Sequence, residues 1–304
     1  MPKNKPLAYA SMSLLDFQER FSTDGDCREH LFSMRFPVGF ICPRCSSNKH
    51  GTISTRGLWQ CKKCRAQISV TDGTIFHRTR TPLRLWFWAI FLIACDKRGH
   101  SALQLHKELG IPYDRAWLML HKIRSAMAQR DSKYKLNGTV EMDEAYFGAP
   151  SPGSSGRGTS RAKALVAVSV SVDGKPRFAK IQVVKRLDSR QAALFATNNI
   201  EPGTRIRTDG LNIYNILENE YVHEPLVAIG QPKDKLLKWV HMEISNAKAF
   251  IAGTFHGLEA KHLQRYLGEF CYRFNRRYRE AELFERLLTA CAEATPLSLD
   301  ELTL

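Results

Sequence analysis

Apolar side chains recur at helical spacing near the start of the chain. Within residues 11–34, Leu14, Phe17 and Phe21 follow this spacing, and Ser13 precedes them as a candidate helix cap. We therefore predict helical structure across this segment. The residues that follow it are short of apolar runs and rich in turn formers, which predicts a small unit with little hydrophobic core.

A strongly apolar run follows Pro82, a residue type favoured at helix starts. Its most apolar part, residues 85–95, is far shorter than the ~20 residues that a membrane span needs, and it predicts a buried helix. Two more helical patterns flank residues 110–112. They predict a helix-turn-helix, whose second helix would read the DNA major groove; an ordinary helical hairpin is the alternative. The helix-turn-helix prediction points five cations towards DNA (Arg115, His121, Lys122, Arg124 and Arg130) and four apolar residues inward (Trp117, Leu118, Leu120 and Ile123).

The pattern changes in the second half of the chain. Residues 139–146, 164–172 and 177–184 are rich in β-branched side chains and predict strands, and Asp173-Gly174 is a hairpin signal between the last two. Residues rich in Gly, Ser and Pro predict a mobile loop at 150–161. Strands mixed with helices make this half α/β or α+β. The later predicted elements are a helix at 189–197, a strand at 204–208 and helices at 234–254 and 259–277.

Four of the eight cysteines have metal-ligand spacing. Cys42, Cys45, Cys61 and Cys64 form two C-x2-C pairs separated by fifteen residues. Two such turns complete a four-thiolate shell with no open position, which is typical of structural Zn²⁺; a redox dithiol pair is the alternative. We expect a reducing cytoplasm, since nothing else suggests secretion. The cysteines without partner spacing are predicted to be core or surface thiols: Cys27, Cys95, Cys271 and Cys291.

The composition adds a strong positive charge. The formal net charge is +15, which predicts a polyanionic partner because fixed positive charge attracts phosphate and releases its counterions. A basic surface that only keeps the protein soluble is the alternative. Around the cysteine pairs, cations favour DNA over a protein partner for the predicted zinc ribbon: Lys49, Arg56, Lys62, Lys63 and Arg65.

Two predicted strands carry acidic residues. Glu141, Asp143 and Glu144 lie in the first strand of the second half, and Asp209 ends the strand at 204–208. Carboxylates cost free energy in strands that pack into a core. Two strand carboxylates suit a magnesium site because hard cations prefer oxygen ligands. A solvated strand edge for Glu141 and a turn cap for Asp209 are the alternatives.

The chain resembles the insertion-sequence transposases that join an N-terminal zinc ribbon to an RNase-H-like core. The resemblance spans about residues 15–280 and implies an α/β fold: an RNase-H-like mixed sheet flanked by helices, preceded by a helix-turn-helix region and a small zinc ribbon. Four segments carry it in order: MDEAYFG (142–148), TDG (208–210), HMEISNAKAFIAGTFHG (241–257) and FCYRFNRR (270–277). The predicted organisation is an N-terminal helical segment (1–35), a zinc ribbon (36–75), a helix-turn-helix-like region (80–132), a catalytic domain (138–280) and a C-terminal tail (281–304).

The resemblance also implies a catalytic site. In similar DDE-type recombinases, two Asp and one Glu hold two metal ions, and a Lys often follows the Glu by seven residues. By this resemblance, Asp143 and Asp209 correspond to the two aspartates, and Lys248 corresponds to the lysine. Seven residues before the lysine stands His241, so the motif reads Asp, Asp, His, Lys. We expect Mg²⁺ or Mn²⁺, with Mn²⁺ suiting an imidazole ligand better.

The third ligand has alternatives on the same predicted helix. His241 ranks first because residues 241 and 248 lie two turns apart on one helix face. Asn246 offers a carbonyl oxygen and ranks second, and Glu243, the nearby carboxylate, ranks third. A surface or capping role is the alternative for His241.

The implied function is binding of the inverted-repeat ends of an insertion sequence, followed by metal-dependent cleavage and strand transfer. The implied partners are double-stranded DNA, both transposon ends and target, and further copies of the chain; no membrane is involved, and the expected location is the bacterial cytoplasm, at the nucleoid. The alternatives are a non-catalytic DNA-binding regulator, a nuclease of the same fold and a domesticated transposase.

A basic segment towards the C-terminus is predicted to contact DNA phosphates, and a solvated face is the alternative. Its cations are Lys261, His262, Arg265, Arg273, Arg276, Arg277 and Arg279.

Overall fold

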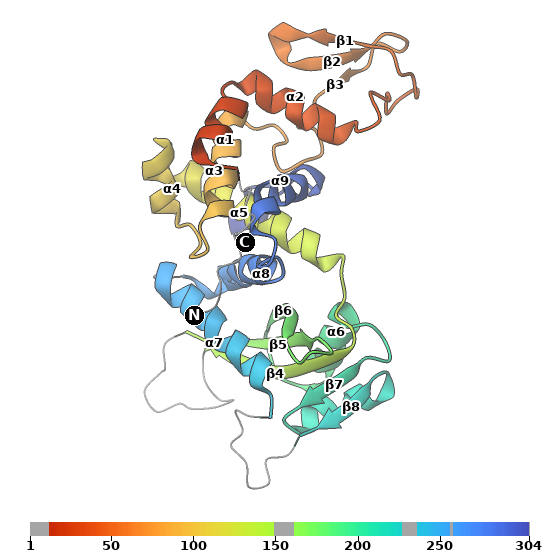
Figure 1. Ribbon diagram of the computed structural model, residues 1–304, viewed down its shortest axis with the longest axis vertical. Coiled ribbons are helices and arrows are strands. Elements are labelled where there is room, and N and C mark those ends of the chain that lie inside the picture. The colour runs from red at the N-terminus through yellow and green to blue at the C-terminus, as the bar shows by residue number, and fades with distance from the viewer. Residues whose placement is uncertain (1–11, 149–160, 227–235, 256–257, 304) are drawn as a thin grey trace, which may run out of the picture. The chain divides into compact units, whose positions relative to one another are not determined.

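The chain folds into two compact units (Figure 1). The computed structural model describes residues 12–148, 161–226, 236–255 and 258–303. The first unit comprises Met1–Gln129 and Tyr278–Leu304, and the second comprises Arg130–Arg277. The loop predicted at 150–161 lies outside the described residues except for its last position, as do the first two positions of the helix predicted at 234–254.

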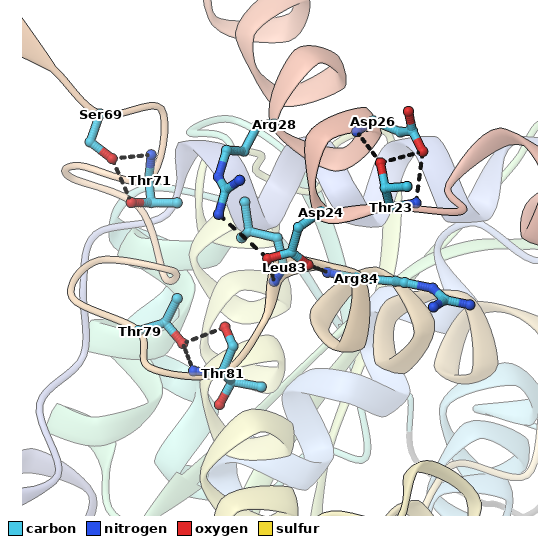
Figure 2. Close-up of polar contacts among 10 residues, drawn as sticks. All are labelled: Thr23, Asp24, Asp26, Arg28, Ser69, Thr71, Thr79, Thr81, Leu83 and Arg84. Carbon is cyan, nitrogen blue, oxygen red and sulfur yellow. Dashed lines mark hydrogen bonds and ion pairs between the residues drawn. The ribbon is translucent and has the colours of Figure 1, made fainter. Parts of the chain in front are cut away.

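The first unit begins with two helices, α1 (Leu14–Arg20) and α2 (Asp24–Arg35), where one helical stretch was predicted. Ser13 caps α1, as predicted. The chain breaks before α2 because Thr23 and Asp26 form a capping box: the Thr23 hydroxyl accepts the Asp26 N–H at 3.2 Å, and the Asp26 carboxylate accepts the Thr23 N–H at 2.7 Å (Figure 2). The spacing of Thr23 and Asp26 is the sequence signal for this break.

A three-stranded antiparallel sheet follows α2. Its strands β1 (His50–Ile53), β2 (Leu58–Cys61) and β3 (Gln67–Ile68) pair in chain order, with a short 3₁₀ turn, η1 (Ser54–Arg56), between the first two. Trp59 of β2 is buried and stacks on Phe32 of α2, with ring centroids 4.6 Å apart. This aromatic stack joins the small sheet to the helix beside it.

Helices α1, α3 (Leu83–Cys95) and α9 (Leu283–Glu293) of the first unit share an aromatic core. The remaining helices of this unit are α4 (Ala102–Leu109), α5 (Tyr113–Ser132, whose last turn belongs to the second unit) and α10 (Asp300–Thr303), with η6 (Glu280–Glu282) before α9. Phe17 of α1 stacks on Phe91 of α3 at 4.3 Å and meets Phe284 of α9 edge-on at 5.5 Å. The segment predicted as a C-terminal tail is therefore part of this core. Over the described residues, no helix is both long and apolar enough for a membrane span.

Helix α5 departs from the predicted DNA-reading face. His121 is fully buried against Trp117, with ring centroids 4.0 Å apart, and Arg124 is buried with a guanidinium N–H donated to the His100 carbonyl at 2.9 Å. The prediction that these two side chains face DNA is wrong, because the middle of α5 is covered on several sides. Arg115, in the first turn of the helix, is exposed.

The second unit contains a five-stranded mixed sheet. Strands β4 (Thr139–Phe147), β5 (Ala162–Val170) and β6 (Pro176–Val184) are antiparallel neighbours, and β7 (Arg205–Thr208) and β8 (Val222–Pro225) continue the sheet in parallel beyond β4. The sheet order is β6-β5-β4-β7-β8. Gly174 makes the β5–β6 turn with a left-handed φ of 74°, as the hairpin signal predicted. The predicted mixed sheet flanked by helices is confirmed.

Helices cover both faces of this sheet (Figure 1). Helix α7 (Lys238–Thr254), η5 (Ala260–His262) and α8 (Leu263–Phe274) follow the sheet in the chain, and α7 and α8 pack on one face through a core that includes Val166, Val240 and Leu267. Helix α6 (Ser189–Asn199) and the 3₁₀ segment η3 (Asn212–Asn219) cover the other face around Met142 and Phe195. Alternate residues of β4 therefore face different helical layers.

The basic segment at the end of α8 is largely structural. Arg273 pairs with Glu269 at 2.8 Å, and Arg276 pairs with Asp131 at 2.7 Å, all with little exposure. Arg277 donates to backbone carbonyls at the start of β6. The prediction that these three arginines contact DNA phosphates is therefore wrong. Their guanidinium groups bind carboxylates and backbone carbonyls within the second unit. The members of the predicted set that remain exposed are Lys261 and Arg279.

Asn275 explains why this segment is held so closely. Its side-chain carbonyl accepts the Ala179 N–H at 2.7 Å, and its amide donates to the Ala179 carbonyl at 3.1 Å and to Asp131 at 2.8 Å. The side chain thus pairs with β6 as a neighbouring strand would. Asn275 of the FNRR sequence therefore fixes the C-terminal end of α8 to strand β6.

Candidate active site and zinc ribbon

Two turns of the same shape carry the four paired cysteines. In the first turn the Ser46 N–H donates to the Cys42 carbonyl at 2.9 Å, and in the second the Arg65 N–H donates to the Cys61 carbonyl at 3.0 Å. Ser46 and Arg65 each follow the second cysteine of a pair, and both have left-handed φ, 56° and 61°. The repeated backbone turn directs two pairs of sulfurs to one place.

The sulfur positions fit a tetrahedral zinc ion. All four sulfurs lie within 4.8 Å of one another, and the Cys42–Cys64 and Cys45–Cys61 sulfur pairs are each 3.6 Å apart. Thiolates bound at ~2.3 Å to a tetrahedral ion lie about 3.8 Å apart. The Cys64 N–H donates to the Cys61 sulfur and lowers the pKa of that thiol to about 6, which favours the thiolate that a metal needs.

The parallel pairing of β4 and β7 brings the two predicted aspartates together. The register aligns Val140 with Ile206 and Glu141 with Arg207. Two residues further along each strand, Asp143 lies in the middle of β4 and Asp209 directly follows the end of β7. One oxygen each from Asp143, Glu144 and Asp209 lie within 4.8 Å of one another. This oxygen-rich set fits a hard divalent cation such as Mg²⁺ or Mn²⁺.

His241 lies beside the first aspartate. Its Nε2 is 3.0 Å from Asp143 Oδ2, and the imidazole and the carboxylate are both partly buried. Helix α7 packs on the face of the sheet to which Asp143 points, and the first turn of the helix meets the middle of β4. His241 thus adjoins Asp143, but it falls outside the group in which oxygens of Asp143, Glu144 and Asp209 lie within 4.8 Å of one another.

Glu144 is a member of the acidic group that the sequence motif did not single out as a ligand. It lies on the η3 side of β4, where the Tyr214 hydroxyl donates to its Oε2 at 3.1 Å. Burial, and next the Glu144 charge, raises the pKa of Tyr214 well above its usual range, so the phenol stays a donor. The only signal for Glu144 in the sequence is that it directly follows Asp143. Strand alternation alone predicts that these two side chains point to opposite faces of the sheet.

Two other predicted site residues, Glu243 and Lys248, lie on different sides of α7. Glu243 projects about 200° around the helix from His241. It is buried on the core stripe of α7, where Asn246 donates to its Oε1 at 3.4 Å. Lys248 is exposed and projects within about 20° of His241. Glu243 therefore points away from the acidic corner, the group formed by Asp143, Glu144 and Asp209. Lys248 lies on the same side of the helix as the His241 imidazole.

The buried Glu243 carboxyl predicts a pH effect on stability. Burial raises its pKa, so the folded chain retains a proton that the unfolded chain has lost, and stability falls as pH rises from the unfolded pKa through the folded one. Glu243→Gln resembles the protonated form. We expect the variant to match wild type at about pH 4 and to exceed its Tm by roughly 2–4 °C at about pH 8. Thermal unfolding across this range measures the difference; a constant offset at all pH values would contradict the assignment.

Known proteins share both parts of the chain. Residues 135–275 match the ISXO2-like transposase domain, and residues 22–67 match the transposase zinc-ribbon domain. The chain is 26% identical over 207 residues to an uncharacterized protein in transposable element ISH50 of Halobacterium salinarum, which covers 62% of this chain and 68% of that protein. The crystal structure of the Mos1 mariner paired end complex with Mn aligns with 67% of this chain and 77% of its own, with 14% identity and a TM-score of 0.27.

The two domain matches follow one another in the order that the sequence motifs predicted, ribbon first and acidic sheet domain second. They agree with the four-cysteine site and with the mixed α/β sheet described above. The chain belongs to the insertion-sequence transposases that join a zinc ribbon to a DDE-type transposase domain.

Proposed function

We propose that the protein binds the inverted-repeat ends of an insertion sequence and catalyses their cleavage and transfer to target DNA. The observation that carries this proposal is the acidic corner, where Asp143, Glu144 and Asp209 offer oxygens within 4.8 Å of one another and His241 adjoins Asp143. Such a constellation of hard ligands is what metal-assisted phosphoryl transfer requires.

Each residue of the corner has a proposed role. Asp143, the most central, would hold both divalent ions, and Asp209 and His241 would each hold one. Divalent ions bound there would supply the activation of a water or a DNA 3′-hydroxyl and the stabilisation of the leaving oxygen. Lys248, exposed on the His241 side of α7, contacts a DNA phosphate near the break.

The zinc ribbon supplies a surface for DNA phosphates. Residues 36–71 contain no acidic residue. Their cations are exposed: Arg44, Lys49, Arg56, Lys62, Lys63 and Arg65. Positive charge without carboxylates in the same segment favours phosphate over a protein surface of mixed charge.

We propose that strand cleavage and transfer take place in the cytoplasm, at the nucleoid. We also propose that two or more copies of the protein act together, because two ends must be joined.

Strand transfer with a labelled repeat end tests the proposed function. We expect wild-type protein with Mg²⁺ or Mn²⁺ to give both a nicked end and a product joined to target DNA. Cleavage without joining would identify a nuclease instead. Binding of the repeat end with neither product, under both metals, would identify a regulator or a domesticated transposase.

A further inference from the structure

The first turn of α7 is capped from another part of the chain. Leu237 stands at the N-cap and supplies no side-chain cap. Instead, one oxygen of Glu141, on β4, accepts the Trp239 N–H at 2.7 Å and the Val240 N–H at 2.9 Å. A helix leaves its first N–H groups without partners of its own, so a remote carboxylate satisfies two of them here.

The capping carboxylate is itself buried. Glu141 is only 6% exposed, and this burial raises its pKa, against the opposing effect of the two N–H donors. A buried acid costs free energy unless it is hydrogen-bonded. A residue needed only to fill space at this position would be apolar, as its neighbours Val140 and Met142 are.

The cap adjoins the acidic corner. Glu141 and Asp143 are two residues apart on β4, so they point to the same face of the sheet. Val240, which donates to Glu141, directly precedes His241, which contacts Asp143. Strand β4 therefore binds two consecutive residues of α7. Glu141 accepts the backbone N–H of Val240, and Asp143 contacts the imidazole of His241.

We propose that Glu141 is a positioning residue, whose carboxylate fixes the first turn of α7 so that His241 stays beside Asp143. This inference rests on the proposed function of the corner. Glu141 acts through the helix, without touching DNA or the reacting atoms. Its loss frees the first turn, and the imidazole leaves its place at the carboxylate.

The first unit offers a matched control. There Asp24, on α2, accepts the Leu83 N–H at 3.3 Å and the Arg84 N–H at 2.9 Å, capping α3 from a distance (Figure 2). Helix α3 also lacks a side-chain cap of its own, since Pro82 occupies its N-cap. Asp24→Ala therefore removes the same kind of interaction from a helix that carries no residue of the corner.

The experiment compares the full-length chain with Glu141→Ala, Glu141→Gln and Asp24→Ala. We expect both alanine variants to lower Tm, because each loses a helix cap. Glu141→Ala alone should speed amide exchange at Trp239 and Val240, shift the His241 ring resonances in NMR spectra of the metal-free protein and weaken Mn²⁺ binding roughly 10- to 100-fold. Glu141→Gln keeps an acceptor oxygen and should restore most of the Mn²⁺ affinity.

The outcomes separate this inference from the proposed function. Unchanged His241 resonances in Glu141→Ala, with only Tm lowered, would show a merely structural cap and overturn the inference. An equal loss of Mn²⁺ affinity in Asp24→Ala would overturn it as well. If wild type binds no Mn²⁺, the proposed function fails, while amide exchange and the His241 resonances still decide whether Glu141 positions the helix.

Discussion

Asp143→Asn is expected to reduce strand cleavage and strand transfer by at least about 10³-fold, the scale on which a single electrostatic contribution to a transition state is lost. The substitution keeps the side-chain shape and an oxygen that can accept from His241, 3.0 Å away. It removes the negative charge that a divalent ion needs from its ligand. Asp209→Asn should have a similar effect, since its oxygen lies in the same group.

DNA affinity separates this effect from a loss of binding. The cations proposed to contact phosphates are untouched, and removing a carboxylate lowers repulsion, so both variants should bind a repeat end at least as tightly as wild type. Asp173→Asn, on the exposed β5–β6 turn, is the control and should retain full activity. Gel-based cleavage and strand-transfer assays measure the rates; near wild-type rates in both site variants would reject the assignment.

Loss of zinc is the second large expected effect. Structural zinc contributes about 10–16 kcal/mol of apparent binding free energy in small zinc domains, and the ribbon buries few other apolar side chains besides Phe40, Trp59 and Ile68. Cys61→Ser removes the sulfur whose pKa is lowered to about 6, so we expect the variant to lose its zinc and the ribbon to unfold. Affinity for a repeat end should fall at least about tenfold in ~0.1 M salt, because the ribbon cations lose their fixed arrangement.

Cys95→Ser is the matched control, since Cys95 is an exposed thiol outside the ribbon. It should retain zinc and DNA affinity. Metal analysis gives the zinc content, and limited proteolysis reports whether the ribbon has unfolded. A Cys61→Ser protein that keeps a protease-resistant ribbon without zinc would contradict the structural role of the metal.

The sequence predicted those features that depend on local spacing. The two C-x2-C pairs predicted the four-sulfur cluster, and the β-branched runs predicted β4, β5 and β6. The placement of Asp143 beside Asp209 followed from the family resemblance, and the register of β4 and β7 now gives its physical basis.

The features that were missed depend on partners distant in the chain. Arg124 was predicted to face DNA, but a buried guanidinium is satisfied by the carbonyl of His100. Arg276 was expected at a phosphate, but its partner is Asp131, 145 residues away. Periodicity identifies a polar residue without showing whether a distant group neutralises it, so burial of charged side chains could not be predicted. Glu141 was read as a strand carboxylate for the same reason.

Crystals of the full chain soaked in Mn²⁺ give the most direct measurement of the acidic corner. Anomalous scattering should show manganese bound to the carboxylates of Asp143 and Asp209, with the His241 imidazole in its coordination shell. Crystals that take up manganese at other carboxylates and leave this corner free of it would contradict the proposed catalytic site.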